Sequence, residues 1–529
     1  MSHSRSHIMN KKIWAAAAVG ALVLFPACTD LTEVPQSAIT PENFYNNEDE
    51  VIGGLASVYA NLRTTNDEYY NISEISTDEM IVPTRGQDWY DNGKWLDIHR
   101  QTFSPASPAG LDNINSAWTN LFIGVARANV VLSGIENVNF ASKATVTAEL
   151  RVLRAFYYFL LNDLFGGVPI VTDVSIEPRP QNTRAEVFAF IESELKAARP
   201  DLPAKWSQDM NGRVTQGAVD AMLASLYLNA QVMSGTVSAT GLQPGTQRWQ
   251  DALTEANAVI NSGNYALATD ASMACGSPGC GWRKNFTADN NLTPEIIFAV
   301  KYVNVTDIGL NFLMRALHYN QYSGAEAPWN GFSTLADTYA AFDPNDERRF
   351  IFLAGPQVNL ATGQPALDRQ NHPLVFDPNI PDVTAAAEGA GVRIDKWPLD
   401  PNHVNRNNGN DYAWFRLGEM YLIRAEAENE LGQTAAAIAD INLLRARVFS
   451  PPKPIATTLT QAQVRDAILQ ERLFEMTAEG KRRQDLIRMN KFTQGTWYAK
   501  TAFDPWKILF PIPQTQIETN PMLVQNPGY

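Results

Sequence analysis

The clearest structural signal in the chain lies at residues 149–169, which read ELRVLRAFYYFLLNDLFGGVP. Apolar side chains recur there every three or four residues, at Leu150, Leu153, Tyr157, Leu160 and Leu164. That spacing places them along one face of a helix. The glycine pair at 166–167 ends the helix, because glycine tolerates the backbone angles of a helix terminus. The segment therefore predicts a long amphipathic helix that packs against other helices.

Similar apolar stripes, each closed by Gly, Pro or Asn, occur on both sides of this segment, at residues 44–62, 114–135, 184–198 and 214–233. Near the C-terminus, residues 412–431 and 434–448 form two more stripes joined by a short Gly-Gln turn. Small and large residues alternate in this pair as in a tetratricopeptide-type helical hairpin. The periodicity predicts a mostly α-helical fold built from such hairpins.

The amino-acid composition changes between residues 264 and 410, where Gly, Pro, Asn and Asp are frequent and aromatic residues are scattered. This composition predicts a loop-rich insertion with a few short strands, one of them at 296–303. The expected organisation is a leader at 1–27, a helical body at 28–263, the insertion at 264–410, and C-terminal hairpins with a tail at 411–529. We expect the C-terminal part to pack with the helical body as one unit.

The N-terminal segment is typical of an export signal. Two lysines at 11–12 precede an apolar run at 13–25, which is too short to span a bilayer, and Pro-Ala-Cys follows at 26–28. A cysteine at this point predicts lipid attachment at Cys28. Phe25 and Pro26 depart from the usual residues of a lipobox, so an ordinary thiol at Cys28 is the alternative. After Cys28 no apolar run approaches the ~20 residues of a membrane helix.

Charge and cysteine content restrict the partners of the chain. The formal net charge of −14 argues against nucleic acid, because binding phosphates requires clustered Lys and Arg. Apart from Cys28, the cysteines are Cys275 and Cys280, separated by a Gly-Ser-Pro-Gly turn. In an exported protein they predict a disulfide, with two free thiols as the alternative. A metal site is the weaker interpretation, since no further Cys or His lies close by.

Several sequence blocks, taken in order, resemble the SusD/RagB family of outer-membrane nutrient-binding lipoproteins. The blocks are 35–45, 54–59, 118–132 with Arg-Ala-Asn at 127–129, 149–169, Gly-Arg-Val-Thr at 212–215, 416–447, 471–488 with Glu-Gly-Lys-Arg-Arg at 479–483, Phe-Pro-Ile-Pro at 510–513 and Gln-Asn-Pro-Gly-Tyr at 525–529. The resemblance covers nearly the whole chain after Cys28. It implies four tetratricopeptide-like hairpins joined by an irregular ligand-side region, which the insertion would supply.

The resemblance also implies a function and a partner. Members of the family capture nutrients at the cell surface, anchored by lipid to the outer membrane, and cover a SusC-type TonB-dependent barrel as a lid. The implied ligand is an oligosaccharide or polysaccharide, and the lid needs no cofactor. Some members of the family serve peptide uptake, so oligopeptide binding is the alternative.

Two segments have the composition of a carbohydrate site, which needs exposed aromatic planes for stacking and polar groups for hydrogen bonds. The first is 83–95, where the candidate contacts are Arg85, Asp88, Trp89 and Trp95. The second is 324–332, with Trp329 and Asn330 as candidates. The alternative for each segment is an aromatic side chain that folds back onto the core. Trp282, beside the predicted disulfide, is a weaker candidate.

Metal binding and catalysis are less well indicated. Residues 405–411 and 88–91 are rich in oxygen-bearing side chains, yet neither has the ligand ladder of a Ca²⁺ loop, so solvated turns are the expected structure. A glycoside hydrolase would need paired carboxylates, for which Glu74, Asp78 and Glu79 are the nearest candidates. No motif of another enzyme class is present, and we expect a binding protein without enzymatic activity. Charged residues in the blocks are expected to form structural ion pairs, namely Arg151, Arg154, Glu479, Arg482 and Arg483.

Overall fold

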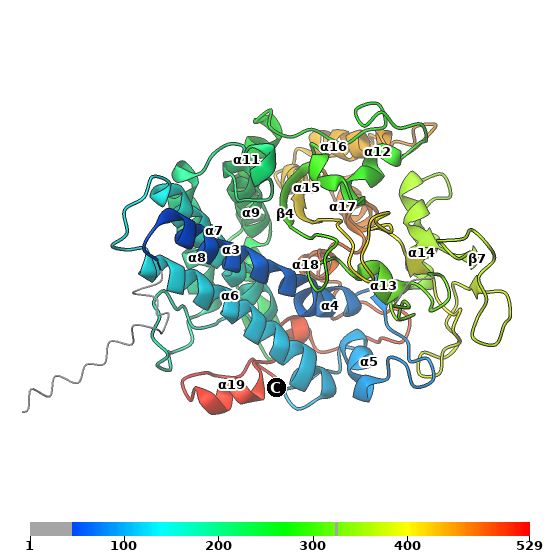
Figure 1. The fold of residues 1–529 in the computed structure, drawn as a ribbon, viewed down its shortest axis with the longest axis horizontal. Coiled ribbons are helices and arrows are strands. Elements are labelled where there is room, and N and C mark those ends of the chain that lie inside the picture. The colour runs from blue at the N-terminus through cyan, green and yellow to red at the C-terminus, as the bar shows by residue number, and fades with distance from the viewer. Residues whose placement is uncertain (1–44, 323–325) are drawn as a thin grey trace, which may run out of the picture. The chain divides into compact units, whose positions relative to one another are not determined.

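Helices dominate the part of the chain that the structure describes, which is residues 45–322 and 326–529 of a computed structural model (Figure 1). Residues 45–529 cluster into one unit. The α-helices are α3 (Glu48–Asn61), α4 (Glu68–Ile75), α5 (Lys94–His99), α6 (Asn115–Gly134), α7 (Lys143–Phe165), α8 (Arg184–Ala198), α9 (Gln216–Leu228), α10 (Ala230–Met233), α11 (Trp249–Asn261), α12 (Cys280–Arg283), α13 (Phe312–Ala316), α14 (Ala336–Ala341), α15 (Leu417–Glu430), α16 (Thr434–Ala446), α17 (Gln461–Met476), α18 (Arg482–Arg488) and α19 (Gln514–Thr519).

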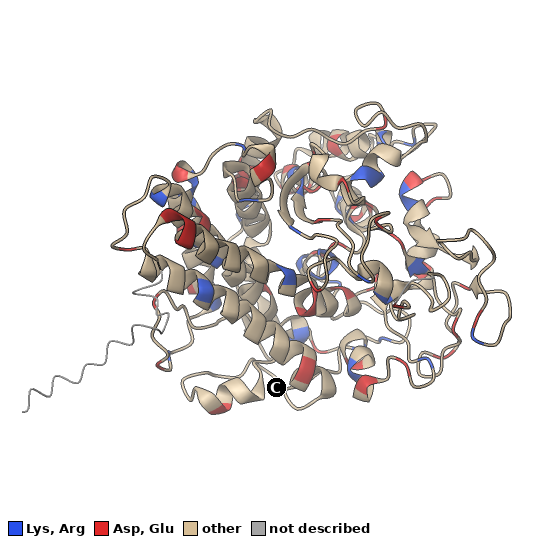
Figure 2. Cartoon of the chain, in the orientation of Figure 1, with Lys and Arg blue, Asp and Glu red and all other residues tan. Residues whose placement is uncertain are grey.

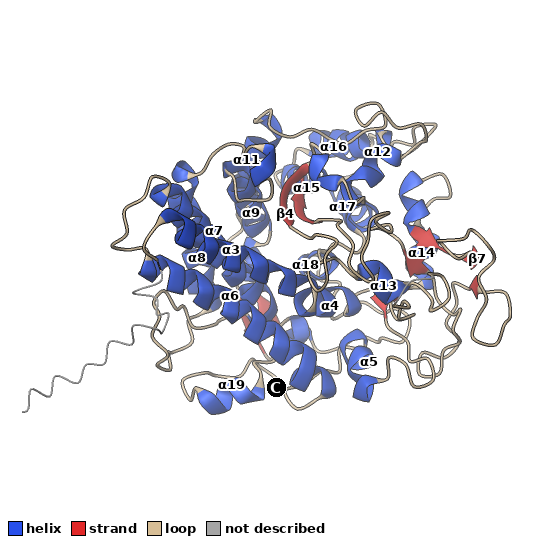
Figure 3. Cartoon of the chain, viewed as in Figure 1, coloured by secondary structure: helices blue, strands red, loops and turns tan. Residues whose placement is uncertain are grey.

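The strands are short and lie in two-stranded antiparallel pairs, β1 with β5, β4 with β10, β2 with β3, β6 with β9 and β7 with β8. Their bounds are β1 (Met80–Ile81), β2 (Thr236–Ser238), β3 (Gly241–Gln243), β4 (Ile296–Val300), β5 (Ser333–Thr334), β6 (Phe352–Leu353), β7 (Gly355–Pro356), β8 (Val375–Phe376), β9 (Arg393–Ile394) and β10 (Tyr412–Arg416). Figure 3 shows several of them as small arrows among the loops.

The predicted helix at 149–164 is present within α7, which is buried along most of its length. The helices around it approach closely. A Cβ at Gly124 in α6 would lie 2.4 Å from Cζ of Tyr157, so only glycine leaves room for this ring. The hydroxyl of Tyr157 donates to the carbonyl oxygen of Val58 in α3 at 2.8 Å. Tyr157 therefore joins three helices of the body.

Some of the closest helix contacts join neighbours along the chain, namely α6 with α7, α7 with α8, and α15 with α16, as expected for helical hairpins. Others join helices that are not consecutive, namely α9 with α11, α15 with α17, and α11 with α15 across the insertion. This arrangement confirms the mostly helical, tetratricopeptide-like fold with a few short strands. No helix among the described residues is both long enough and apolar enough to cross a bilayer.

The start of the C-terminal hairpin differs from the prediction. Residues 412–416 were expected to be helical, but they form strand β10, which pairs with β4. The sequence Tyr-Ala-Trp-Phe-Arg is rich in aromatic residues, which favour strands, and all five side chains are buried. Helix α15 begins only at Leu417.

The predicted structural ion pairs are confirmed. Arg151 and Arg154 pair with Glu194, Glu479 with Arg416 and Lys396, Arg482 with Asp78, and Arg483 with Asp163. Figure 2 shows acidic and basic positions interspersed over the helices, as such pairing requires. Several of these groups are fully buried, so they fasten helices and insertion together in the interior.

Candidate functional site

The two segments chosen for their composition lie next to each other in the structure, although about 240 residues of chain separate them. Strand β1 lies just before the first segment, and β5 directly follows the second. The two strands pair antiparallel, with Ile81 opposite Ser333. The indole Nε1 of Trp89 donates to the carbonyl oxygen of Trp329 at 2.6 Å. The structure thus brings both predicted tryptophans to one place. Residues 324 and 325 of the second segment lie outside the described residues.

A tight turn holds Trp89 in position. The backbone N–H groups and carbonyls of Arg85 and Asp88 bond each other at 2.9 and 3.0 Å across this turn. Trp89 follows with a φ of 61°, in the left-handed region that bulky residues rarely adopt. Such strain persists where the surrounding contacts fix the backbone, and it is concentrated at functional sites.

Trp89 belongs to an aromatic cluster with Trp95 and Phe332. The ring centroids lie 5.5 to 5.8 Å apart in edge-to-face arrangements. A Cβ at Gly331 would lie 2.3 Å from the Trp89 ring, so the glycine allows the indole to lie on the backbone of the second segment. Trp89 remains half-buried, whereas Trp95 is only 6% exposed and donates to Asp91 at 2.6 Å. Trp95 thus packs on the body, the alternative foreseen for this segment.

Arg85 and Asn330 are also buried, at 1% and 0% exposure. Arg85 donates to the carbonyl oxygens of Asn330 and Gly331, both at 2.9 Å, and to that of Ala390 at 2.8 Å. Burial lowers the pKa of Arg85 to about 10. The guanidinium therefore connects three backbone segments and leaves little of itself for a ligand.

These hydrogen bonds of Arg85, which we call the Arg85 clamp, lead to a testable prediction. Arg85→Ala removes the donors of two buried carbonyl oxygens, those of Asn330 and Gly331, and each costs roughly 1–3 kcal/mol when left unpaired. The Ala390 carbonyl keeps its hydrogen bond from Arg393, and removal of the buried charge offsets part of the cost. We expect the variant to unfold about 3 kcal/mol more easily in urea, with the segments 83–95 and 326–332 exchanging amide hydrogens faster than the helices. Arg100→Ala, at a half-buried position nearby in sequence, is the control. Unchanged exchange at both segments would contradict the clamp.

A polar rim adjoins Trp89 through Asp88. The Tyr319 hydroxyl donates to Asp88 at 2.5 Å, and Arg369 pairs with the same carboxylate at 3.2 Å. The Arg369 guanidinium also lies 4.4 Å from the centre of the Tyr319 ring and contacts Glu388. Burial and the hydrogen bond to Asp88 raise the pKa of Tyr319 to about 12, so the hydroxyl stays protonated at neutral pH. We call Asp88, Trp89, Tyr319, Trp329 and Arg369 the tryptophan face.

The tryptophan face has the chemistry of a saccharide site. Trp89 and Trp329 are both half-buried, and the Trp89 indole is fixed by its hydrogen bond to the Trp329 backbone. The side chains of Asp88 and Arg369 are 38% and 51% exposed and offer planar polar groups. Sequence reasoning missed Tyr319, Arg369 and Glu388. The aromatic and polar run His-Tyr-Asn-Gln-Tyr at 318–322 was a usable signal for Tyr319, but nothing local marks the other two.

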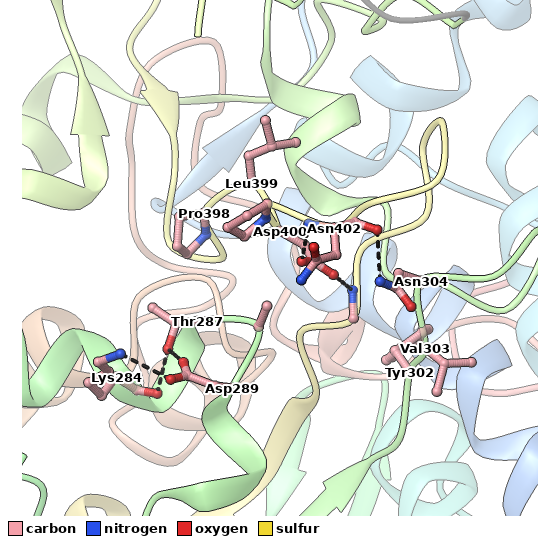
Figure 4. A pocket seen from close by; sticks show the side chains of 13 residues that line it. Lys284, Thr287, Asp289, Tyr302, Val303, Asn304, Pro398, Leu399, Asp400 and Asn402 are labelled. Atoms are coloured by element: carbon pink, nitrogen blue, oxygen red, sulfur yellow. Dashed lines mark hydrogen bonds and ion pairs between the residues drawn. The ribbon is translucent and has the colours of Figure 1, made fainter. Parts of the chain in front are cut away.

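A cleft of about 600 Å³ lies between residues 284–289, 302–304, 398–402 and Gly409 (Figure 4). Its polar groups largely bond one another, since Thr287 donates to Asp289 at 2.6 Å and Asn304 donates to the carbonyl oxygen of Asn402 at 2.7 Å. Tyr302, the aromatic residue in its lining, is only 8% exposed. The cleft therefore offers a ligand few free polar groups and no exposed stacking plane.

Polar side chains of the oxygen-rich segment 405–411 bond other groups of the protein. Asp411 accepts from the Tyr302 backbone at 3.0 Å and pairs with Lys301, and the amide of Asn408 donates to the carbonyl oxygen of Leu310 at 3.1 Å. Among the described residues, no group of three or more His, Cys, Asp or Glu side chains is arranged to hold a metal ion.

The carboxylates considered for hydrolysis are not open to a substrate. Glu74 and Glu79 are 0% and 1% exposed, and Asp78 is paired with Arg482 at 2.7 Å. Burial raises the pKa of Glu74 to about 7, against the lowering effect of its hydrogen bond to Glu79. Burial and the charge of Glu74 raise the pKa of Glu79 well above its ordinary value. Glu74 and Glu79 therefore lie inside the fold, where a substrate does not reach them.

This buried pair makes stability depend on pH. The folded chain keeps a proton that the unfolded chain loses above pH ~4.5, so the free energy of unfolding should fall between about pH 5 and pH 7. The slope for one proton is about 1.4 kcal/mol per pH unit. We expect Glu74→Gln to flatten it, with the exposed Glu518→Gln as the control. Urea titrations at pH 5, 6, 7 and 8 measure the effect, and an unchanged slope in Glu74→Gln would refute the assignment.

The remaining predicted residues are placed as follows. Cys275 and Cys280 form a disulfide with a Cα–Cα distance of 5.8 Å. Trp282 is 1% exposed and donates to Glu475 at 2.9 Å, so it belongs to the core and not to a ligand surface. Cys28 and the leader at 1–27 lie outside the described residues.

Comparison with known proteins places the chain in a family. Residues 369–505 match the model of the SusD family, and residues 36–228 match a model described as starch-binding associating with outer membrane. Together the two matches span more than half of the chain.

Individual known proteins are similar to this chain over most of their length. A SusD-like protein of Formosa agariphila is 23% identical over 563 residues, 94% of this chain and 96% of its own. The starch-binding protein SusD of Bacteroides thetaiotaomicron is 26% identical over 513 residues, covering 87% of this chain and 85% of its own. The solved structure of surface glycan-binding protein A from Bacteroides thetaiotaomicron in complex with laminarihexaose is 21% identical, with a TM-score of 0.70 over 91% of this chain and 100% of its own.

The fold of stacked helical hairpins with an irregular insertion is thus the fold of these binding proteins. The chain belongs to the SusD/RagB family.

Proposed function

We propose that the protein captures oligosaccharides or polysaccharides at the cell surface and passes them to a SusC-type TonB-dependent transporter in the outer membrane. The observation that carries this proposal is the meeting of Trp89 and Trp329 beside the polar rim of Asp88, Tyr319 and Arg369. Sugar rings stack on aromatic planes through their C–H faces and bond planar polar groups through their hydroxyls. The tryptophan face supplies both kinds of contact.

The comparisons support a glycan as the ligand. One relative is named as a starch-binding protein, and one structural neighbour was solved with a laminarihexaose. A peptide site would use an open strand edge and side-chain pockets, whereas the tryptophan face consists of loops with aromatic side chains. The absence of catalysis in the proposal is supported by the burial of Glu74 and Glu79.

The location and the partner rest on the leader and the family. A lipid on Cys28 would hold the protein at the membrane by burying methylene groups, each worth roughly 0.8 kcal/mol. The description of one matching family model, which includes association with the outer membrane, supports this location. Energy for transport comes from the barrel in this proposal, and the binding protein acts as its lid.

The experiment that tests ligand class is affinity electrophoresis of the chain in gels containing starch, laminarin, xylan or galactomannan. Oligopeptides are tested alongside by calorimetry. We expect retardation in at least one gel and no heat from peptides. Peptide binding without retardation in any gel would replace the proposal by peptide uptake.

The partner is tested separately by co-purification from native outer membranes in mild detergent. We expect a TonB-dependent barrel to be recovered with the protein. Recovery of the protein without any barrel would count against the partnership while leaving the ligand unaffected.

A further inference from the structure

A second cleft, of about 210 Å³, shares no lining residue with the tryptophan face. It lies where the loop between α8 and α9 meets the residues after α11 and the loop before β4. The amide of Asn211 donates to the carbonyl oxygen of Asn291 at 2.6 Å and so joins two of its walls. We call it the Trp206 cleft after the indole in its lining.

Trp206 is held rigidly in this cleft. Its Nε1 donates to the carbonyl oxygen of Val214 at 2.8 Å, and the guanidinium of Arg213 lies 4.2 Å from the ring centre. Arg213 is fixed in turn by Glu149, which is fully buried, at an Nε to Oε2 distance of 3.0 Å. A half-buried indole anchored in this way is pre-organised to receive a planar apolar face.

Hydrogen-bonding groups in the cleft are available. The side-chain amides of Gln208, Asn264 and Asn291 line it and bond no other group within residues 45–322 and 326–529. Each amide offers both donors and an acceptor, as neighbouring hydroxyls of a sugar ring require.

The charge of the cleft favours a neutral ligand. Its lining contains no Asp or Glu, so it offers no carboxylate to a metal ion or a cationic ligand. Of its two cations, Arg213 is paired with Glu149, which leaves Lys205 at the exposed rim. We infer that the Trp206 cleft is a second saccharide-binding site, which holds one sugar unit of a neutral polysaccharide independently of the tryptophan face.

This inference rests on the proposed glycan-binding function and extends it to two sites. Two weak sites on one polymer chain raise its overall retention, because the second contact is intramolecular once the first has formed. A second site therefore explains capture of a polymer better than one face alone.

The test compares Gln208→Ala/Asn291→Ala with Gln250→Ala/Gln470→Ala, which removes two exposed amides outside the cleft. Affinity electrophoresis in starch, laminarin, xylan and galactomannan measures retention of the full chain in mild detergent. We expect the cleft variant to bind the retarding polysaccharide about tenfold more weakly and the control to match wild type. Equal retention of both variants would overturn the inference.

Hydrogen exchange separates the two sites. With a retarding polysaccharide we expect protection at residues 204–213 in addition to 84–95 and 326–332. Protection of 84–95 and 326–332 alone would reject the second site and leave the proposed function standing. Retardation in none of the four gels would reject both.

Discussion

Glu475→Ala is expected to lower the free energy of unfolding by about 3–5 kcal/mol, because it removes the central acceptor of a buried charge network. One carboxylate oxygen of Glu475 accepts from Trp282 at 2.9 Å and from Arg416 at 2.6 Å, and it also contacts Arg447. The other accepts from Arg348 at 3.0 Å. The side chains of all these residues are buried, so water cannot replace the lost partner.

The direction in which the pKa of Glu475 shifts shows how strongly the neighbouring arginines act on it. Burial alone would raise its pKa, yet Arg447, Arg416 and Arg348 outweigh burial and hold the pKa well below the ordinary value. The network joins α17, which carries Glu475, to Trp282 and Arg348 of the insertion. Loss of Glu475 should therefore loosen the insertion as well as the helices.

Urea unfolding at pH 7 measures this effect. The control is Asp173→Ala, which removes the same charge from a pair whose carboxylate is 53% exposed, where water replaces the lost partner and the cost should be much smaller. Glu475→Gln, which keeps the volume, provides a second variant if the alanine variant does not fold. A Glu475→Ala midpoint equal to that of the control would show that the network does not stabilise the fold.

Periodicity was sufficient to predict the helices because apolar side chains recur at helical spacing along them, although α7 is buried on nearly every side. The stripe at 184–198 corresponds to α8, with the same bounds. Residues 149–165 of the block at 149–169 lie in α7, which ends before the glycine pair as predicted. The prediction of a helix at residues 412–416 was wrong, because a fully buried strand has no alternation of apolar and polar residues that would distinguish it from a buried helix. Its partner β4 is more than a hundred residues away, and this pairing decides the structure.

The site could be predicted in composition but not in geometry. Aromatic residues in polar loops identified Trp89 and Trp329, whereas their contact depends on the pairing of β1 with β5. The sequence also did not indicate which loop side chains point into the interior. Arg85 is an ordinary surface residue by its sequence context, yet the bend of two loops surrounds it with carbonyl oxygens.

Trp89→Ala/Trp329→Ala is expected to abolish retention by any polysaccharide that the wild type binds. Burying the apolar surface of one large side chain contributes about 1.5–3 kcal/mol. Loss of both indoles should therefore weaken binding roughly a thousandfold, which is below detection for a weak polysaccharide interaction. The polar rim cannot compensate, because the hydroxyls of a sugar bond water equally well once the ring no longer stacks.

The same double variant should leave the helical fold intact. Trp89 contacts Trp95, Phe332 and Gly331, all of which lie in or beside the loop segments, so its loss leaves the helical hairpins unchanged. The circular dichroism spectrum should therefore match that of wild type, with a small decrease in melting temperature from the lost packing. Binding and folding are thus separable at this site.

Affinity electrophoresis of the double variant beside Trp249→Ala/Phe140→Ala provides the measurement, because that control removes two half-buried aromatic residues that lie outside both site segments. Loss of retardation confined to Trp89→Ala/Trp329→Ala would assign glycan capture to the tryptophan face. Undiminished retardation of this variant would place the ligand elsewhere, and an equal loss in the control would mean that capture depends on dispersed aromatic surface and not on this site.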